Sequence, residues 1–233
     1  MFTLYSADFT GNPGNCSYPH KTVVMNTDNL REAVCHDYVC AEYKNHYRNG
    51  ENFISADCLP VDCDNDHSED PKDWVTPADV LEAFPGVSIA IHYSRFNNRE
   101  KNGKPARPKF HVLFPIDRMT DATLYSDMKK LVNSIFPYFD TKALDAARFF
   151  FGTQEPNVEL YPGRMNLTEF LNNDEFDAGL PGGHKKDAVI PEGSRNAVMS
   201  RFAGIVIKKY GDSEKAYQSC LLYTSPSPRD RQK

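Results

Sequence analysis

Apolar and polar residues alternate along Phe53–Cys63, which predicts either two strands or one long bent strand. Because successive side chains of a strand point to opposite faces, Asp62 and Asp64 share one face while Val61 and Cys63 share the other. The apolar pair is expected to be buried. Two neighbouring carboxylates repel each other unless a cation lies between them, and oxygen ligands of this kind suit Mg²⁺ or Mn²⁺.

A second alternating run, residues 109–114, predicts another strand. Three large apolar side chains share its core face: Phe110, Val112 and Phe114. Lys109 and His111 share the opposite face, which we expect to be open. A lone histidine on a strand most often has a structural role. A lysine two residues away favours anion binding instead, because both side chains donate hydrogen bonds to phosphate oxygens.

Shorter patterns predict the other elements. Strands are expected at residues 21–25, 87–93, 148–152 and 158–161. A helix is expected from Thr27 to a turn at residues 48–50, because four residues form an apolar stripe: Leu30, Val34, Tyr38 and Val39. Two further helices are expected to begin at Thr76 and Thr120, since threonine caps helices. The polar, basic residues 94–108 predict a loop.

This order of elements predicts a mixed α/β (α+β) fold with a largely antiparallel sheet. We expect one domain over residues 1–178, followed by a linker rich in Gly, Pro and Lys over residues 179–193. Residues 194–219 predict the start of a helical module. We interpret residues 220–233 as an adapter-derived foreign tail, so that the natural sequence is expected to continue beyond Ser219.

The composition is that of an ordinary soluble protein, with 233 residues of which 40% are hydrophobic and 25% charged. Neither a membrane span nor a signal peptide is apparent, and we expect a cytoplasmic protein with no membrane partner. The formal net charge of −5 gives no general support to nucleic-acid binding, which must therefore depend on a local basic patch.

The six cysteines are expected to be reduced thiols in a cytoplasmic protein. Their spacing raises a zinc site as an alternative: Cys35 with Cys40 and Cys58 with Cys63, near His36 and His67. Zinc ligands usually stand closer together in sequence. We interpret these cysteines as small core residues.

Two more candidate residues follow the third predicted helix. Asp140 comes after a proline-terminated segment, and it is interpreted either as a helix N-cap or as a third carboxylate of a metal site. Arg148 is a candidate contact for phosphate or template, because a guanidinium group binds phosphate oxygens in pairs.

In this order and spacing, three motifs resemble those of the archaeo-eukaryotic primase superfamily: Asp62-x-Asp64, Lys109-Phe110-His111 and Phe139-Asp140. The resemblance is closest to the primase-polymerases of phages, plasmids and integrated elements, and it spans about residues 21–163. The predicted helix after the linker resembles the helical module that follows such domains. Lys109 departs from the family pattern, in which a small residue, commonly Ser, stands two positions before the histidine.

The resemblance implies a sheet like that of RNA-recognition domains, joined to an N-terminal α/β unit, and a template-directed nucleotidyl transfer. Under it, two Mg²⁺ or Mn²⁺ ions are held by Asp62, Asp64 and Asp140. It also implies that His111, Lys109 and Arg148 bind the triphosphate of an NTP or dNTP. Lys104 and Arg107 would follow a single-stranded DNA template. A replicative helicase, on the same chain or separate, is the implied partner.

Two other functions remain open. A non-catalytic replication-initiation module could bind DNA and recruit a helicase, with the carboxylates acting as turn and cap residues. The acidic chain and the shared face of Asp62 and Asp64 count against it. A sugar-nucleotide transferase could use Asp62-x-Asp64 for its metal, but the sequence contains no glycine-rich dinucleotide loop to support it.

Overall fold

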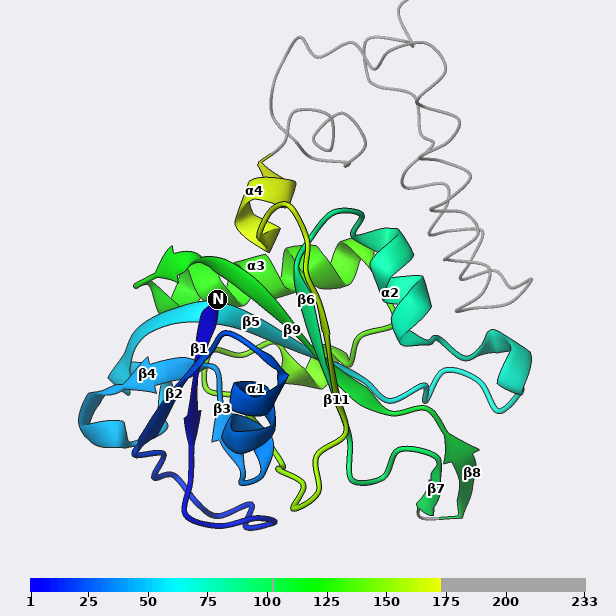
Figure 1. Ribbon diagram of the computed structural model, residues 1–233, viewed down its shortest axis with the longest axis horizontal. Coiled ribbons are helices and arrows are strands. Elements are labelled where there is room, and N and C mark those ends of the chain that lie inside the picture. The colour runs from blue at the N-terminus through cyan, green and yellow to red at the C-terminus, as the bar shows by residue number, and fades with distance from the viewer. Residues whose placement is uncertain (102, 173–233) are drawn as a thin grey trace, which may run out of the picture.

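The computed structural model describes residues 1–101 and 103–172, and its central element is a five-stranded sheet (Figure 1). The strand order is β11-β6-β9-β5-β4. Every neighbouring pair is antiparallel. The strands are β4 (Ala41–Tyr43), β5 (Phe53–Cys63), β6 (Ile89–Tyr93), β9 (Phe110–Met119) and β11 (Val158–Tyr161). The predicted long strand is therefore a single element, β5.

A four-stranded antiparallel sheet, in the order β10-β3-β1-β2, lies beside the first. Its strands are β1 (Phe2–Ser6), β2 (His20–Val24), β3 (Tyr38–Val39) and β10 (Phe149–Phe150). A hairpin of β7 (Arg99–Lys101) and β8 (Lys104–Arg107) projects from the body of the protein (Figure 1). The predicted α+β class with mainly antiparallel sheets is confirmed.

Four α-helices complete the described part of the chain: α1 (Thr27–Val34), α2 (Pro77–Ala83), α3 (Ala122–Ile135) and α4 (Leu167–Leu171). Short 3₁₀ turns lie at Lys44–His46, Gly50–Asn52, Pro71–Asp73 and Thr141–Ala143. α2 begins with the expected Thr76, whose side chain and Asp79 form a capping box. α3 is capped by Asp121 rather than by Thr120. None of these helices combines the length and apolarity of a membrane span.

Both faces of the five-stranded sheet are buried. On one face Val61, Val112 and Ile91 belong to a cluster that includes Val80 of α2 and Val132 of α3. On the other face, a second cluster joins the sheet to α1 and the four-stranded sheet, through Cys58, Ala90, Leu113, Leu4, Leu30 and Phe150. Figure 1 shows α1 on one side of the sheet and α2, α3 and α4 on the other. The expectation of an open face beside Leu113 was wrong, because the N-terminal sheet covers it.

Several predicted elements change in the folded chain. The helix expected to reach residues 48–50 ends at Val34, because Tyr38 and Val39 pair with β1 and β10 instead of continuing the helix. The strands expected near residues 148–152 and 158–161 belong to different sheets. The loop over residues 94–108 contains the β7–β8 hairpin. The expected linker, helical module and foreign tail lie outside the described residues.

The buried carboxylate of Asp37 fixes β10 beside β3. It accepts hydrogen bonds of 2.9 Å from the backbone N–H groups of Gly11, Asn12 and Gly152. Gly152 passes so close to the chain that a Cβ there would lie 2.1 Å from the carbonyl oxygen of His36. These contacts hold the segment that carries Arg148 and Phe150 against the five-stranded sheet.

Candidate active site

A row of polar residues crosses the three central strands at one end of the sheet. Asp62 of β5 pairs in register with His111 of β9, and His111 pairs with His92 of β6. Residues in register on antiparallel strands point to the same face, so these three side chains lie side by side. The predicted alternation is confirmed for Asp62 and His111, since Val61 and Phe110 lie on the opposite, apolar face. Asp64 and Lys109, which were expected on the same strands, lie just beyond the ends of β5 and β9.

Asp62 is a nearly buried carboxylate whose side chain is 11% exposed. Among the described residues, its Oδ1 has no hydrogen-bond partner, and its Oδ2 lies 3.8 Å from the guanidinium group of Arg148. Burial raises the pKa of Asp62 to about 7, with a further contribution from the charge of Asp64, while Arg148 opposes the shift. A buried carboxylate with an unpartnered oxygen is a site that favours a cation.

Asp64 is paired with Lys109 rather than being free. Lys109 Nζ lies 2.9 Å from Asp64 Oδ1 and donates a 3.0 Å hydrogen bond to the Asp64 carbonyl oxygen. The same ammonium group lies 3.5 Å from a carboxylate oxygen of Asp66. The expectation that Lys109 projects from an open face was wrong, because only 6% of its side chain is exposed. Its charge is used within the protein to neutralise acidic groups after β5.

Asp140 has the cap role that its sequence context suggested, and it lies near Asp62. Its carboxylate accepts a 2.9 Å hydrogen bond from the backbone N–H of Lys142 and caps the turn Thr141–Ala143. Its own backbone N–H donates a 2.7 Å hydrogen bond to the carbonyl oxygen of Asp62. Its charge lies near enough to contribute to the raised pKa of Asp62. The cap role therefore coexists with a position near Asp62.

His111 is neutral in this environment. Burial lowers its pKa to about 3, and the opposing effect of Asp64 is smaller. The 3.7 Å separation of its Nε2 from Asp62 Oδ1 is therefore not an ion pair, and it is too long for a hydrogen bond. The ring of Phe150 lies over His111, with 4.7 Å between centroids. His111 is thus buried, with one ring nitrogen directed toward Asp62.

The two expected template contacts differ in position. Arg107 is 1% exposed and donates hydrogen bonds to the carbonyl oxygens of Asn65 (2.8 Å) and Ser68 (3.3 Å), which favours a structural role. Lys104, on the β7–β8 hairpin, is 50% exposed and lies 3.2 Å from Asp66. Lys104 is therefore the one of the pair that can reach an external phosphate.

Sequence reasoning did not single out Tyr38 or His92. The Tyr38 hydroxyl lies 3.0 Å from His92 Nδ1 and 3.2 Å from His111 Nδ1. A signal for His92 was present, because it is a polar residue within the apolar strand β6. Tyr38 had no such signal, because the sequence pattern placed it in a helix and the structure places it in β3.

The expected metal ligands are the three carboxylates. Asp62, Asp64 and Asp140 supply hard oxygen donors, and the unpartnered Oδ1 of Asp62 fits a cation. Among residues 1–101 and 103–172, no three His, Cys, Asp or Glu side chains are arranged closely enough to hold a metal ion. The ion pair with Lys109 engages the Asp64 carboxylate. The donor chemistry of the three carboxylates suits Mg²⁺ or Mn²⁺, but their arrangement in the described residues does not form a closed metal site.

The cysteines lie elsewhere in the fold. Cys40, Cys58 and Cys63 are buried in the two hydrophobic clusters, as expected of small core residues. Cys35, which the zinc alternative paired with Cys40, is half-buried at the end of α1.

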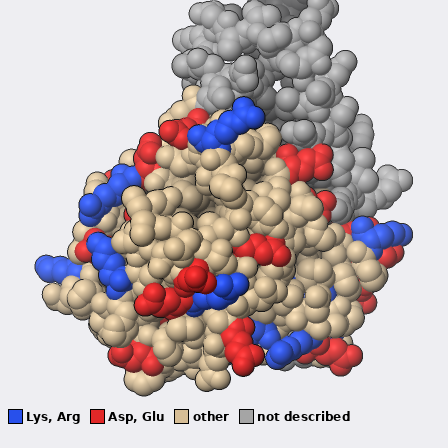
Figure 2. Space-filling model, in the orientation of Figure 1, with Lys and Arg blue, Asp and Glu red and all other residues tan. Residues whose placement is uncertain are grey.

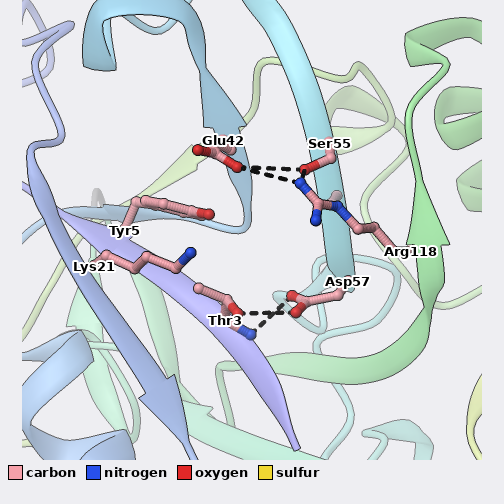
Figure 3. Close-up of a pocket in the computed structure, with 8 residues that line it drawn as sticks. Thr3, Tyr5, Lys21, Glu42, Ser55, Asp57 and Arg118 are labelled. Carbon is pink, nitrogen blue, oxygen red and sulfur yellow. Dashed lines mark hydrogen bonds and ion pairs between the residues drawn. The ribbon is translucent and has the colours of Figure 1, made fainter.

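A separate hollow lies toward the start of β5 (Figure 3). Its polar groups are largely paired with one another. Asp57 accepts hydrogen bonds from the backbone and hydroxyl of Thr3, and Arg118 lies against Glu42 and Ser55. The polar groups of this hollow are therefore less available to bind a ligand than the carboxylate of Asp62.

The face of the protein shown in Figure 2 gives no simple indication of a nucleic-acid surface. On the side shown in Figure 2, Lys and Arg side chains are interspersed with Asp and Glu, and no broad area of positive charge is visible. Any nucleic-acid contact on that side has to use individual basic residues rather than an extended field.

Comparisons with known proteins leave the family open. No family model matches the sequence, and no curated protein matches it either. Among solved structures, the chain is similar to the AEP domain of the cyanophage S-2L primase-polymerase, with 12% sequence identity and a TM-score of 0.40 over 70% of this chain and 81% of that chain. At this TM-score the similarity carries no argument about function. We therefore base the proposed function on the residues of this chain.

Proposed function

We propose that this chain is the catalytic domain of a template-directed nucleotidyltransferase, a DNA primase-polymerase that makes primers for a mobile element. The observation that carries the proposal is the buried carboxylate of Asp62, whose Oδ1 has no hydrogen-bond partner among the described residues. His111 lies in register beside it, and the Asp140 backbone N–H donates to the Asp62 carbonyl oxygen. A cation-favouring carboxylate beside hydrogen-bond donors for phosphate is the chemistry that nucleotidyl transfer requires.

Asp62, Asp64 and Asp140 would hold two Mg²⁺ or Mn²⁺ ions. When bound, ions of this class acidify the attacking 3′-hydroxyl and stabilise charge on the transferred phosphate and on pyrophosphate. Asp62 contributes the buried oxygen and is kept in place by its strand and by the backbone hydrogen bond from Asp140. Asp64 exchanges Lys109 for metal.

This exchange frees the Lys109 ammonium group to bind the triphosphate of an NTP or dNTP. A triphosphate carries more negative charge than one carboxylate, so the cation gains by moving to it. His111 donates a hydrogen bond to the same triphosphate from Nε2. Arg148, whose side chain is 31% exposed, holds the incoming phosphates from the side of β10.

The template is a single DNA strand, and Lys104 on the projecting hairpin contacts its backbone. A replicative helicase is the partner that such a domain needs to expose its template. Both assignments depend on the catalytic proposal.

The test is primer synthesis by the full 233-residue chain on single-stranded DNA, with labelled nucleotides and either Mg²⁺ or Mn²⁺. We expect template-dependent incorporation that Asp62→Asn and Asp64→Asn abolish. Asp127→Asn removes an exposed acid of α3 that pairs with Lys130, and it should retain activity. DNA binding without turnover would instead indicate a non-catalytic initiation module, and turnover without template would indicate a different transferase.

A further inference from the structure

Aromatic rings and arginine side chains form a continuous strip along β10 and the residue that follows it. Phe149 and Phe151 are half-buried, and their rings meet edge to face with 5.0 Å between centroids. The guanidinium group of Arg95 lies over Phe151, 4.0 Å from the ring centroid, and that of Arg48 lies over Phe149 at 4.8 Å. We call these four residues the arginine–aromatic strip.

The strip faces outward because β10 turns only its middle side chain toward the core. Phe150 is buried, and its ring lies 4.7 Å from that of His111. Neighbouring residues of an extended chain point to opposite sides, so Phe149 and Phe151 lie on the other side. β10 is also at the edge of its sheet. Part of both rings therefore stays accessible to an external partner.

The charge of Arg95 is not used within the described part of the protein. Among residues 1–101 and 103–172, no hydrogen bond or ion pair engages its side chain, which contacts only aromatic rings. Arg48 differs, because it donates hydrogen bonds to the carbonyl oxygens of Ala147 (3.0 Å) and Asn15 (3.3 Å). Arg48 therefore holds the strip in place, and Arg95 supplies it with a free positive charge.

The combination of a ring with an unneutralised guanidinium group indicates the chemistry of the partner. A base can stack on the ring, and the phosphate beside that base can pair with the guanidinium group. In a duplex the bases are stacked on one another and cannot reach the ring, whereas a single strand exposes both groups. An acidic peptide would satisfy the charge alone. The strip therefore fits a single-stranded nucleic acid best.

Both ends of the strip adjoin the candidate active site. Arg148, whose guanidinium group lies 3.8 Å from Asp62, directly precedes it in the chain. At the other end, the backbone N–H of Ser94, the residue before Arg95, donates a 2.9 Å hydrogen bond to the Lys109 carbonyl oxygen. Three residues of extended chain span roughly 10 Å, so a strand bound on the strip passes close to the site.

We propose that the arginine–aromatic strip binds single-stranded DNA, with a base stacked on Phe151 and the adjacent phosphate held by Arg95. The proposal deepens the proposed function and rests on it for the identity of the partner, which is its template. Lys104 contacts the backbone of that template, and the strip adds a contact with the bases. This contact does not depend on base sequence, because every base has a π-face.

Fluorescence anisotropy of the full chain in EDTA, without nucleotide, measures the binding of two labelled probes. One is a single strand of about twelve thymidines, and the other is the same strand with abasic sites in place of the bases. Phosphate contacts are common to both probes, so the ratio of the two affinities reports base stacking. We expect the wild type to bind the thymidine strand about ten-fold more tightly than the abasic strand, and more tightly than a duplex of equal length.

Two variants separate the ring from the charge. Phe151→Leu keeps an apolar side chain but removes the ring, and it should bring the ratio close to one, whereas Phe151→Tyr should preserve the ratio. Arg95→Met keeps an extended side chain over the ring. It should weaken the binding of both probes and reduce the slope of log K against log salt by about 0.7.

Matched controls lie outside the strip. Phe53→Leu removes a half-buried ring at the opposite end of β5 from Asp62, and Arg118→Ala removes an exposed guanidinium group near the end of β9. Both should bind the two probes as the wild type does. Arg95→Met tests the strip even if Phe151→Leu does not fold, which thermal unfolding would show.

Equal affinity of the wild type for the two probes overturns the proposal, and so does a ratio unchanged in Phe151→Leu or an Arg95→Met protein that binds like the wild type. A raised KM for nucleotide with unchanged DNA affinity also overturns it, because the strip would then hold the incoming nucleotide. Base-dependent binding that the variants lose, in a chain that incorporates no nucleotide, supports the strip and overturns the proposed catalytic function instead.

Discussion

Lys109 Nζ lies 2.9 Å from Asp64 Oδ1, so a cation expected to bind triphosphate instead neutralises a carboxylate expected to bind metal. The two expectations are compatible if Lys109 and a metal ion compete for Asp64. In the protein alone the lysine prevents the uncompensated repulsion of Asp62 and Asp64. Metal and nucleotide would then bind together, because each removes one member of the ion pair.

Replacing Lys109 with Met tests this competition. Without the ammonium group, Asp64 is free for metal, and we expect the Kd for Mn²⁺ in the absence of nucleotide to tighten about ten-fold, the effect of losing one charge-assisted contact. The KM for nucleotide should rise. Isothermal titration calorimetry measures the first effect, with Lys72→Met, at an exposed lysine paired with Asp70, as control. Unchanged or weaker Mn²⁺ binding would show that lysine and metal do not compete.

Asp62→Asn should stabilise the metal-free protein while abolishing incorporation. The pKa of Asp62 is about 7 in the folded protein and lies above its ordinary value of 3.8. The charged carboxylate therefore lowers the free energy of unfolding as the pH rises above 3.8, and the loss is complete above pH 7. In EDTA at pH 8 we expect the free energy of unfolding to increase by roughly 2–4 kcal/mol, as three pKa units allow. Urea unfolding measures it. A destabilised Asp62→Asn protein would mean that the carboxylate has a structural partner.

We expect the contribution of Lys129 to the free energy of unfolding to increase with pH in mild alkali. Its Nζ is buried against the ring of Tyr125 and donates to the Asp145 carbonyl oxygen, and burial lowers its pKa to about 8. Between pH 8 and 10.5 the unfolded state binds more protons than the folded state, so this residue's contribution to stability rises with pH. From pH 7.5 to 9.5 the rise is about 2 kcal/mol.

The measurement compares urea unfolding of the wild type and Lys129→Met at both pH values. Buried tyrosine and cysteine side chains also titrate in alkali, but their effect is common to both proteins and cancels in the difference. A difference that stays constant with pH would show that Lys129 keeps its ordinary pKa.

Arg107 and Lys104 should respond in opposite ways to truncation. Arg107→Ala leaves the carbonyl oxygen of Asn65 without its donor and should destabilise the protein by roughly 1–3 kcal/mol. Lys104→Ala should leave stability unchanged and weaken single-stranded DNA binding, with the slope of log K against log salt reduced by about 0.7. Fluorescence anisotropy over a salt series provides both affinity and slope. An Arg107→Ala protein of normal stability that loses DNA binding would restore Arg107 as a template contact.

Local pattern was sufficient for the strands that carry the site. The alternation in β5 and β9 correctly placed Val61 and Phe110 on one face and Asp62 and His111 on the other, because side-chain direction in a strand depends only on position. The capping box at Thr76 was likewise readable, since it involves residues three apart.

What covers those faces was decided by the tertiary structure. His111 is buried because Tyr38 and Phe150 lie against its ring, and these two residues meet through the pairing of β3 with β10, more than a hundred positions apart. The same long-range pairing overrode the helical stripe at Tyr38 and Val39. Periodicity reports which residues share a face, but it contains no information about a strand that arrives from elsewhere in the chain. The sequence therefore determined the chemistry of the candidate site, and the packing of two sheets determined its burial, its ion pair and the partners of His111.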